Sequence, residues 1–86
     1  MTAEVIIYSK ANCPYCDRAK QLLSAKNVTW HEIRIDLNPE FQQEMITLSG
    51  GRRTVPQIFI NGQPIGGFDD MAALEKAGKL NALLAM

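Results

Sequence analysis

The chain has 86 residues, of which 47% are hydrophobic and 21% charged. This length and composition are typical of one globular domain with a modest core, here residues 1–86, and exclude a disordered chain. Nine lysine and arginine residues balance nine aspartate and glutamate residues. No net charge therefore attracts nucleic acid or an anionic membrane, and we expect neither as a partner.

The first apolar run of the chain, residues 5–8, is short. Its sequence VIIY is continuous and rich in β-branched side chains, which predicts a central strand covered on both faces. A signal peptide needs a longer apolar region, and a membrane helix needs about 20 apolar residues. We therefore expect a cytoplasmic protein.

Both cysteines of the chain follow in the segment SKANCPYCDRAK. Residues 14–26 are predicted to form a helix with a proline in its first turn, where the missing N–H costs nothing. Cys16, Ala19 and Leu23 share one face of that helix and are expected to point to the core. Cys13 precedes this pattern, so we expect it at the helix N-terminus and exposed to solvent.

The segment TWHEIRID, residues 29–36, alternates in polarity and predicts a half-exposed strand at a sheet edge. Its only histidine, His31, shares a face with Ile33 and Ile35. We therefore interpret His31 as a polar residue of the core.

A second helix is indicated by Asn38 and Pro39, which are typical of an N-cap and a first helical residue. Phe41, Met45 and Leu48 form its apolar stripe. A Gly-Gly pair ends it.

The remaining elements are two strands and two helical segments. Residues 54–60 predict a mostly apolar strand, and Asn61-Gly62 is a strong hairpin signal that returns the chain as a strand over residues 63–66. A third helix is predicted over residues 69–77, and a short amphipathic tail follows at residues 80–84.

The predicted order β-α-β-α-β-β-α-α defines the fold class. It is an α/β arrangement with a four-stranded mixed sheet flanked by helices on both faces. A CxxC motif beside a βαβ unit in a cytosolic protein is typical of a thioredoxin-like redox site.

Two thiols at CxxC spacing can form a structural disulfide, bind a metal or cycle between oxidised and reduced forms. A structural disulfide is not expected in the reducing cytoplasm. A mononuclear zinc site needs two further ligands, and the chain offers only His31, on another strand. A zinc site within one chain is thus excluded. Redox chemistry is favoured, with two inert buried thiols as the alternative.

Thiol–disulfide exchange needs a thiolate nucleophile and a second thiol that resolves the mixed disulfide. A helix N-terminus favours a thiolate, and cysteine pKa values there fall to roughly 3.5–7.5. Cys13 has this position, with Lys10 three residues earlier, so we predict it to be the nucleophile. Cys16 is predicted to be the resolving thiol.

Three segments, CPYC, TVPQIFING and GGFDD, resemble the glutaredoxins in order and spacing, specifically the small bacterial dithiol (class I) type. The resemblance covers essentially the whole chain and implies the thioredoxin fold. It implies a glutathione-dependent thiol–disulfide oxidoreductase with no bound cofactor and glutathione as co-substrate. It also implies a cis bond between Val55 and Pro56, with the Val55 backbone, beside Thr54, pairing with the cysteine part of glutathione. Tyr15 is implied to flank the same groove.

The resemblance further assigns the two ends of glutathione. Lys10 is implied to attract the glycine carboxylate, with Arg52 or Arg53 as weaker candidates whose roles stay open. The N–H groups of Asp69 and Asp70 are implied to hold the γ-glutamyl carboxylate. The Asp70 side chain is implied to take the ammonium group, although acidic residues in a first helical turn are often only caps.

The expected partners are glutathione, glutathionylated proteins and reductases with dithiol cycles such as ribonucleotide reductase. Glutathione reductase is expected to act indirectly, and the protein to be a monomer. One alternative is a redoxin recharged by thioredoxin reductase. Another is a carrier in which Cys13 of two chains and two glutathiones ligate a [2Fe–2S] cluster, which in the family is disfavoured by the proline after the nucleophilic cysteine.

Overall fold

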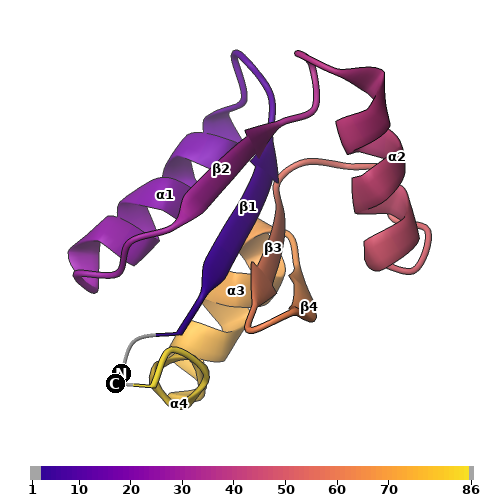
Figure 1. The fold of residues 1–86 in the computed structure, drawn as a ribbon. Helices are drawn as coiled ribbons and strands as arrows, with labels where there is room; N and C mark the ends of the chain where they lie inside the picture. The colour runs from indigo at the N-terminus through magenta and orange to yellow at the C-terminus, as the bar shows by residue number, and fades with distance from the viewer. Residues whose placement is uncertain (1–2, 86) are drawn as a thin grey trace.

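Four strands form one mixed sheet in the computed structural model, which describes residues 3–85 (Figure 1). The strands are β1 (Val5–Ser9), β2 (His31–Arg34), β3 (Gln57–Ile60) and β4 (Gln63–Gly66). Their order across the sheet is β2-β1-β3-β4, with β1 and β2 parallel and the other neighbouring pairs antiparallel. The predicted α/β class and its mixed sheet are confirmed.

Four helices flank the sheet, namely α1 (Pro14–Ala25), α2 (Pro39–Leu48), α3 (Phe68–Lys76) and α4 (Leu80–Leu83). Figure 1 shows α2 apart from α1 and α3. Alternation along β1 explains the two layers, because successive side chains of a strand point to opposite faces. Val5 and Ile7 belong to the larger core cluster with residues of α1 and α3, whereas Tyr8 packs with Met45 of α2 in a second cluster.

Local sequence signals set several element ends as predicted. The Asn38 side chain caps α2, since its Oδ1 accepts a hydrogen bond from the Glu40 N–H at 2.9 Å. The hairpin between β3 and β4 turns at Asn61-Gly62, with φ values of 52° and 79°. Such positive φ angles are what asparagine and glycine adopt most readily in a tight hairpin.

Three boundaries differ from the prediction. The third strand, β3, begins at Gln57 and not at residue 54, because Pro56 has no N–H to donate to a sheet ladder. The edge strand β2 is shorter than the predicted 29–36. The helix α3 begins at Phe68, with Gly67 as its N-cap residue.

Two predicted core positions are wrong. His31 is exposed at the first residue of the edge strand, while Ile33 and Ile35 pack against the α2-side cluster. Leu48 is 53% exposed, and Ile46 packs against that cluster in its place. Both residues lie at an end of their element, His31 at the start of β2 and Leu48 at the end of α2, where the periodic pattern is a weak guide to burial.

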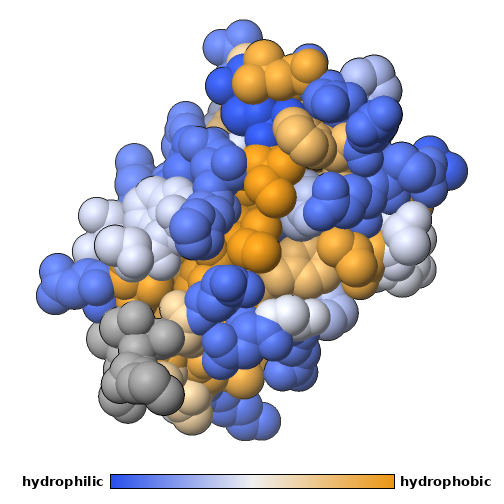
Figure 2. Space-filling view, viewed as in Figure 1, coloured by the Kyte–Doolittle hydropathy of each residue, from blue (hydrophilic) through white to orange (hydrophobic). Residues whose placement is uncertain are grey.

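Figure 2 shows apolar side chains along the middle of one face of the molecule, with polar residues on both sides. Ile6 and Ile33, which pack against the α2-side cluster, are themselves only half-buried. Within residues 3–85, none of the helices has both the length and the apolar character that crossing a membrane requires.

Candidate active site

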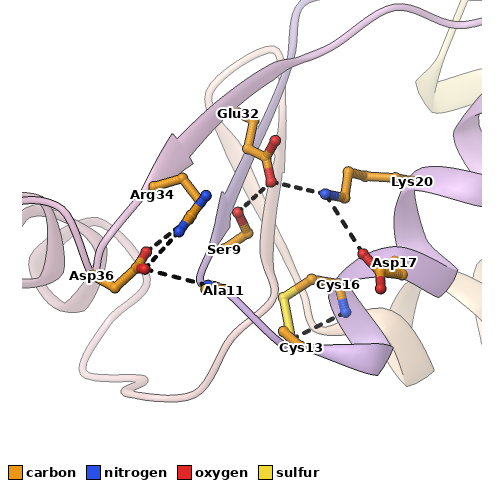
Figure 3. Close-up of polar contacts among 9 residues, drawn as sticks. All are labelled: Ser9, Ala11, Cys13, Cys16, Asp17, Lys20, Glu32, Arg34 and Asp36. Carbon is orange, nitrogen blue, oxygen red and sulfur yellow. Dashed lines mark hydrogen bonds and ion pairs between the residues drawn. A yellow bond between two sulfur atoms is a disulfide. The ribbon is translucent and has the colours of Figure 1, made fainter.

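The two cysteines lie at the amino-terminal end of α1 (Figure 3). Cys13 is the N-cap residue, and Cys16 lies in the first turn. A disulfide joins them across a Cα–Cα distance of 5.2 Å. The Cys13 Sγ accepts a hydrogen bond from the Cys16 N–H at 3.2 Å. The first turn therefore directs an N–H group at the Cys13 sulfur, where the helix dipole also favours negative charge.

Cys13 is less exposed than the sequence predicted. Only 7% of its surface is accessible, against 1% for Cys16, so the expectation of an exposed Cys13 is wrong. The cap geometry turns its sulfur toward the helix, and the walls of a groove stand beside it. Cys13 still lines that groove, whereas Cys16 lines neither of the two grooves that meet here.

The groove beside Cys13 has a volume of about 480 Å³. Its lining includes Lys10, Cys13, Tyr15, Arg53, Thr54 and Val55. Lys10 and Arg53 make no ion pair with any residue in the described range 3–85. Two cationic side chains without an ion-pair partner in that range therefore border the space next to the Cys13 sulfur.

A second groove of about 170 Å³ shares Tyr15, Thr54 and Val55 with the first. Its other lining residues are Arg52, Pro56, Gly67, Phe68, Asp69 and Asp70. The two grooves thus bring together all of the residues that the resemblance assigns to glutathione, from four separate segments of the chain. Lys10 and Arg53 line one end of this surface, and the carboxylates of Asp69 and Asp70 line the other, where Arg52 is paired with Asp70.

The Val55–Pro56 peptide bond is cis, as predicted. Because β3 begins only at Gln57, the backbone of Val55 lies outside the sheet ladder. Val55 borders both grooves. A backbone segment outside the ladder thus runs between the two ends of the groove surface.

Asp70 is held in place by two hydrogen bonds to its Oδ2. The Gly67 N–H donates at 2.9 Å, and Nη2 of Arg52 donates at 3.2 Å. The Gly67 bond, followed by the Arg52 contacts, lowers the pKa of the Asp70 carboxyl. Asp70 is therefore a helix cap, as its position in the first turn indicates, and it also lines the smaller groove. No hydrogen bond within residues 3–85 uses its Oδ1.

Comparison with known proteins agrees with this geometry. Residues 5–65 match the family model described as Glutaredoxin. The chain is 56% identical over 82 residues to glutaredoxin 3 of Escherichia coli (strain K12), covering 95% of this chain and 98% of that protein. The solution structure of glutaredoxin from Brucella melitensis has a TM-score of 0.83 at 49% identity, covering 96% of this chain and 89% of that chain. A crystal structure of a buckwheat glutaredoxin–glutathione complex has a TM-score of 0.88 at 31% identity, covering 96% and 77% of the two chains.

The chain belongs to the glutaredoxin family. It is a glutathione-dependent thiol–disulfide oxidoreductase whose dithiol is Cys13 and Cys16, with the thioredoxin fold that its structural neighbours share. The predicted resemblance to the small bacterial dithiol glutaredoxins is confirmed by the 56% identity to glutaredoxin 3.

The loop that carries Lys10 in this glutaredoxin is tied to the segment after β2 (Figure 3). The Asp36 carboxylate accepts a hydrogen bond from the Ala11 N–H at 3.4 Å. It also forms two hydrogen bonds with Arg34, of 2.7 and 2.8 Å. The Arg34 guanidinium is the main cause that lowers the pKa of Asp36 to about 2. The approach to Cys13 is thus anchored by a residue far from it in sequence.

Tyr15 forms an aromatic wall where the two grooves of the glutaredoxin meet. Its ring lies 6.4 Å from the ring of Phe68, and the Arg18 guanidinium lies 5.3 Å from the Tyr15 centroid. Tyr15 remains 52% exposed. The Tyr15 ring presents an apolar face to a ligand. Binding costs this side chain little conformational entropy, because Phe68 and Arg18 already restrict the orientation of the ring.

Sequence reasoning missed several groove residues. Gln42 of α2 and Ile35 line the larger groove, and Gly67 and Phe68 line the smaller one. Gln42 lies on the exposed side of a predicted helix, where a polar residue carries no signal. In the GGFDD segment, the resemblance implies contacts with glutathione for the two aspartates and for none of the other residues. No group of three or more His, Cys, Asp or Glu side chains in the described part of the chain is placed to hold a metal ion.

Proposed function

We propose that Cys13 is the nucleophile of this glutaredoxin and Cys16 its resolving thiol. The position of Cys13 as the N-cap of α1, with an N–H group aimed at its sulfur, supports the formation of a thiolate there. Cys13 lines the larger groove, whereas Cys16 is buried behind it. An incoming disulfide therefore meets Cys13 first.

The proposed glutathione site spans both grooves. Lys10, at the cationic end, attracts the glycine carboxylate, with Arg53 as a second cation beside it. The backbone of Val55, next to Thr54 and Pro56, aligns the cysteine part of the tripeptide as a short strand. Tyr15 covers the groove between the two ends.

The γ-glutamyl end is proposed to bind at the N-terminus of α3. The first N–H groups of a helix have no intrahelical partner, so those of Asp69 and Asp70 are available to a carboxylate. The Asp70 carboxylate takes the ammonium group through Oδ1, since its Oδ2 already binds Gly67 and Arg52. Arg52 is accordingly proposed to orient Asp70, which its hydrogen bond to Oδ2 supports.

The observation that carries this proposal is the charge arrangement of the groove surface. Its two ends carry opposite charges, and Cys13 lies beside the cationic end. Glutathione likewise has a glycine carboxylate at one end and an ammonium group at the other, with its thiol between them. A ligand of that length and polarity presents its sulfur to Cys13.

The proposed cycle has two routes. The Cys13 thiolate attacks a glutathionylated protein, releases the protein thiolate and becomes a mixed disulfide with glutathione, which a second glutathione resolves. For a protein disulfide, Cys16 attacks Cys13 and releases the reduced protein. Glutathione, kept reduced by glutathione reductase, then restores the dithiol.

The proposed setting is the cytoplasm, where glutathione maintains a reducing poise. The protein is proposed to act as a monomer, and its targets are glutathionylated proteins and dithiol-cycling reductases such as ribonucleotide reductase. The groove lies on the surface of a single chain, which supports a site that needs no second copy.

The test of this proposal is the choice of reductant. Turnover should be fast with glutathione and glutathione reductase and slow with thioredoxin reductase. Lys10→Ala and Asp70→Ala should each slow glutathione-dependent turnover about tenfold, because an exposed charge-assisted contact contributes less than the roughly 1.5–3 kcal/mol of a buried one. The effect should weaken in high salt, since these charges lie at a surface.

Two measurements serve as controls. Reduction of the Cys13–Cys16 disulfide by dithiothreitol, a neutral reductant, should change little in both variants. Lys79→Ala and Glu40→Ala alter exposed charges outside the two grooves and should leave turnover unchanged. Faster recharging by thioredoxin reductase, with no effect of either groove variant, would point to the redoxin alternative. Visible absorption of a cluster in anaerobically purified protein would point to the iron–sulfur carrier.

A further inference from the structure

A polar network joins α1 to the sheet, outside both grooves (Figure 3). The Ser9 hydroxyl donates a hydrogen bond to Oε2 of Glu32 at 2.5 Å. The Lys20 ammonium donates to the same oxygen at 2.9 Å. Ser9 is fully buried, and the side chains of Lys20 and Glu32 are only 28% and 32% exposed. We name these three residues the Ser9–Glu32–Lys20 network.

The network joins three elements around the dithiol. Ser9 is the last residue of β1, Glu32 lies on β2, and Lys20 lies on α1. Ser9 precedes Cys13 by four residues, and Lys20 follows Cys16 by four, which places Lys20 one helical turn beyond Cys16. A buried hydroxyl is costly unless it is hydrogen-bonded, so the Ser9 bond fixes the Glu32 carboxylate on the sheet. The Lys20 ammonium then ties α1 to that fixed carboxylate.

The helix α1 has a second polar anchor at its other end. Lys26 pairs with Glu75 of α3 at 2.8 Å and donates to Asn81 at 2.5 Å. Leu23 lies between the two anchors and Ala19 directly before the first, and both pack on the core. Apolar contacts of this kind are non-directional, whereas hydrogen bonds depend steeply on distance and angle. Within residues 3–85, the Lys20–Glu32 bond is the polar side-chain contact that joins α1 to the sheet, and its directionality restricts rotation of the helix.

This fixation matters most when the disulfide is open. In the oxidised form the covalent bond itself holds Cys13 and Cys16 together. In a mixed disulfide between Cys13 and glutathione, Cys16 is held only by its helix, and its attack requires near-linear alignment of three sulfur atoms. Small misplacements of reacting atoms are costly in rate.

We propose that the Ser9–Glu32–Lys20 network positions Cys16 for the resolving step and thereby determines how fast the dithiol route runs. The three are positioning residues, because they act through α1 and touch no substrate. This inference rests on the proposed function. It extends that function by distinguishing the two routes. The network affects the route in which Cys16 attacks the mixed disulfide, and it does not affect the route in which a second glutathione attacks.

A role of Glu32 in proton transfer explains the Ser9–Glu32–Lys20 network less well than a positioning role. The bonds from Ser9 and Lys20 lower the pKa of Glu32, so this carboxylate remains ionised and is a poor proton acceptor. Its negative charge is compensated by Lys20. The network keeps one charge state at neutral pH, which suits a mechanical anchor.

The reaction that tests the proposal has two balanced steps. In the first, the Cys13 thiolate attacks glutathione disulfide, a Cys13–glutathione disulfide forms, and one glutathione thiolate leaves. In the second, Cys16 loses its proton to solvent and its thiolate attacks the Cys13 sulfur. The Cys13–Cys16 bond forms, the bond to glutathione breaks, and the second glutathione thiolate leaves and takes a proton from solvent.

Reduced protein mixed with excess glutathione disulfide and quenched in acid resolves these steps by mass spectrometry. Lys20→Met and Ser9→Ala should leave the first step unchanged and slow the second about tenfold, so that the mixed disulfide accumulates. Lys20→Arg and Ser9→Thr keep the charge and the hydroxyl and should restore most of the rate. Lys20→Met alters a partly exposed residue, so it remains informative if Ser9→Ala does not fold.

Lys26→Met is the matched control, because it removes the other ammonium anchor of the same helix. It should lower stability without slowing the second step. Equal closure rates in wild type, Lys20→Met and Ser9→Ala would overturn the inference, as would equal slowing by Lys26→Met. A wild type that forms no mixed disulfide with glutathione would instead overturn the proposed function itself, and with it this inference.

Discussion

Cys13 and Cys16 differ in their surroundings more than in their exposure. Both are nearly buried, at 7% and 1%, yet only Cys13 borders a groove and receives the N–H of the first helical turn at its sulfur. Access and charge stabilisation therefore fall on the same atom. Together, groove access and the N–H at its sulfur support Cys13 as the proposed nucleophile and Cys16 as the proposed resolving thiol.

Serine substitutions separate the two roles. Cys13→Ser should abolish all activity, because the chain has no other cysteine that lines the groove. Cys16→Ser should keep the removal of glutathione from mixed disulfides, where a second glutathione resolves the intermediate, and lose reduction of protein disulfides by the dithiol route. The measurement is turnover on a glutathionylated peptide and on a disulfide-bonded protein. Equal loss of both activities in Cys16→Ser would contradict the two-route mechanism.

Among the elements, the junction of β4 with the N-terminus of α3 depends on close packing around one glycine. Gly66, the last residue of β4, has a φ of +114°. A Cβ added there would overlap the Asp70 carboxylate and come within 2.6 Å of Nη1 of Arg52. These side chains could move, but only by giving up the bond between Asp70 and the Gly67 N–H. A glycine is thus required where the strand turns into the helix.

Gly66→Ala should lower both stability and turnover. The unfavourable φ should reduce the free energy of unfolding by about 1–3 kcal/mol, and displacement of Asp70 should also slow glutathione-dependent turnover. Gly78→Ala is the matched control, because Gly78 has a φ of +75° with nothing within 4 Å of the added Cβ. It should lose stability alone. Denaturant titration and turnover assays measure the two effects, and unchanged turnover in Gly66→Ala would refute the role given to Asp70.

For the whole molecule, three carboxylates that accept hydrogen bonds from residues distant in sequence share one property. The pKa values of Glu32, Asp36 and Asp70 are all lowered by their hydrogen-bonding partners. Each carboxyl therefore binds its proton less readily in the folded chain than in the unfolded one. Their contribution to stability is complete above the ordinary values of 4.5 for Glu32 and 3.8 for both aspartates, and is lost as the pH falls through the folded values.

The free energy of unfolding should accordingly decrease as the pH is lowered from 4.5 to about 2, where Asp36 titrates in the folded protein. Asp36→Asn should make this decrease shallower, because one of the three linked carboxyls is removed. Glu40→Gln, a change at an exposed residue whose side chain makes no hydrogen bond within residues 3–85, is the control. Urea midpoints at several pH values measure the slope, and identical slopes in wild type and Asp36→Asn would contradict the linkage.

The sequence by itself determined the features that depend on neighbours along the chain. The apolar run of β1, the Asn38 cap, the Asn61-Gly62 hairpin and the placement of CxxC at a helix N-terminus all follow from local patterns. The order of these elements was enough to predict the mixed sheet, and the three motifs were enough to predict the family. Such signals are readable because backbone geometry and hydrophobic periodicity act over a few residues.

The tertiary structure alone decided what depends on residues distant in sequence. The alternation around His31 predicted a core residue, but His31 is exposed, because tertiary packing decides which part of the sheet is covered. Cys13 is nearly buried, and it shares a groove with the segment before β3, which lies far from it in sequence. The contacts of Asp70 with Arg52 and of Ser9 with Glu32 join residues 18 and 23 positions apart. Polar side chains carry no periodic signal, so only the folded chain shows which of them meet.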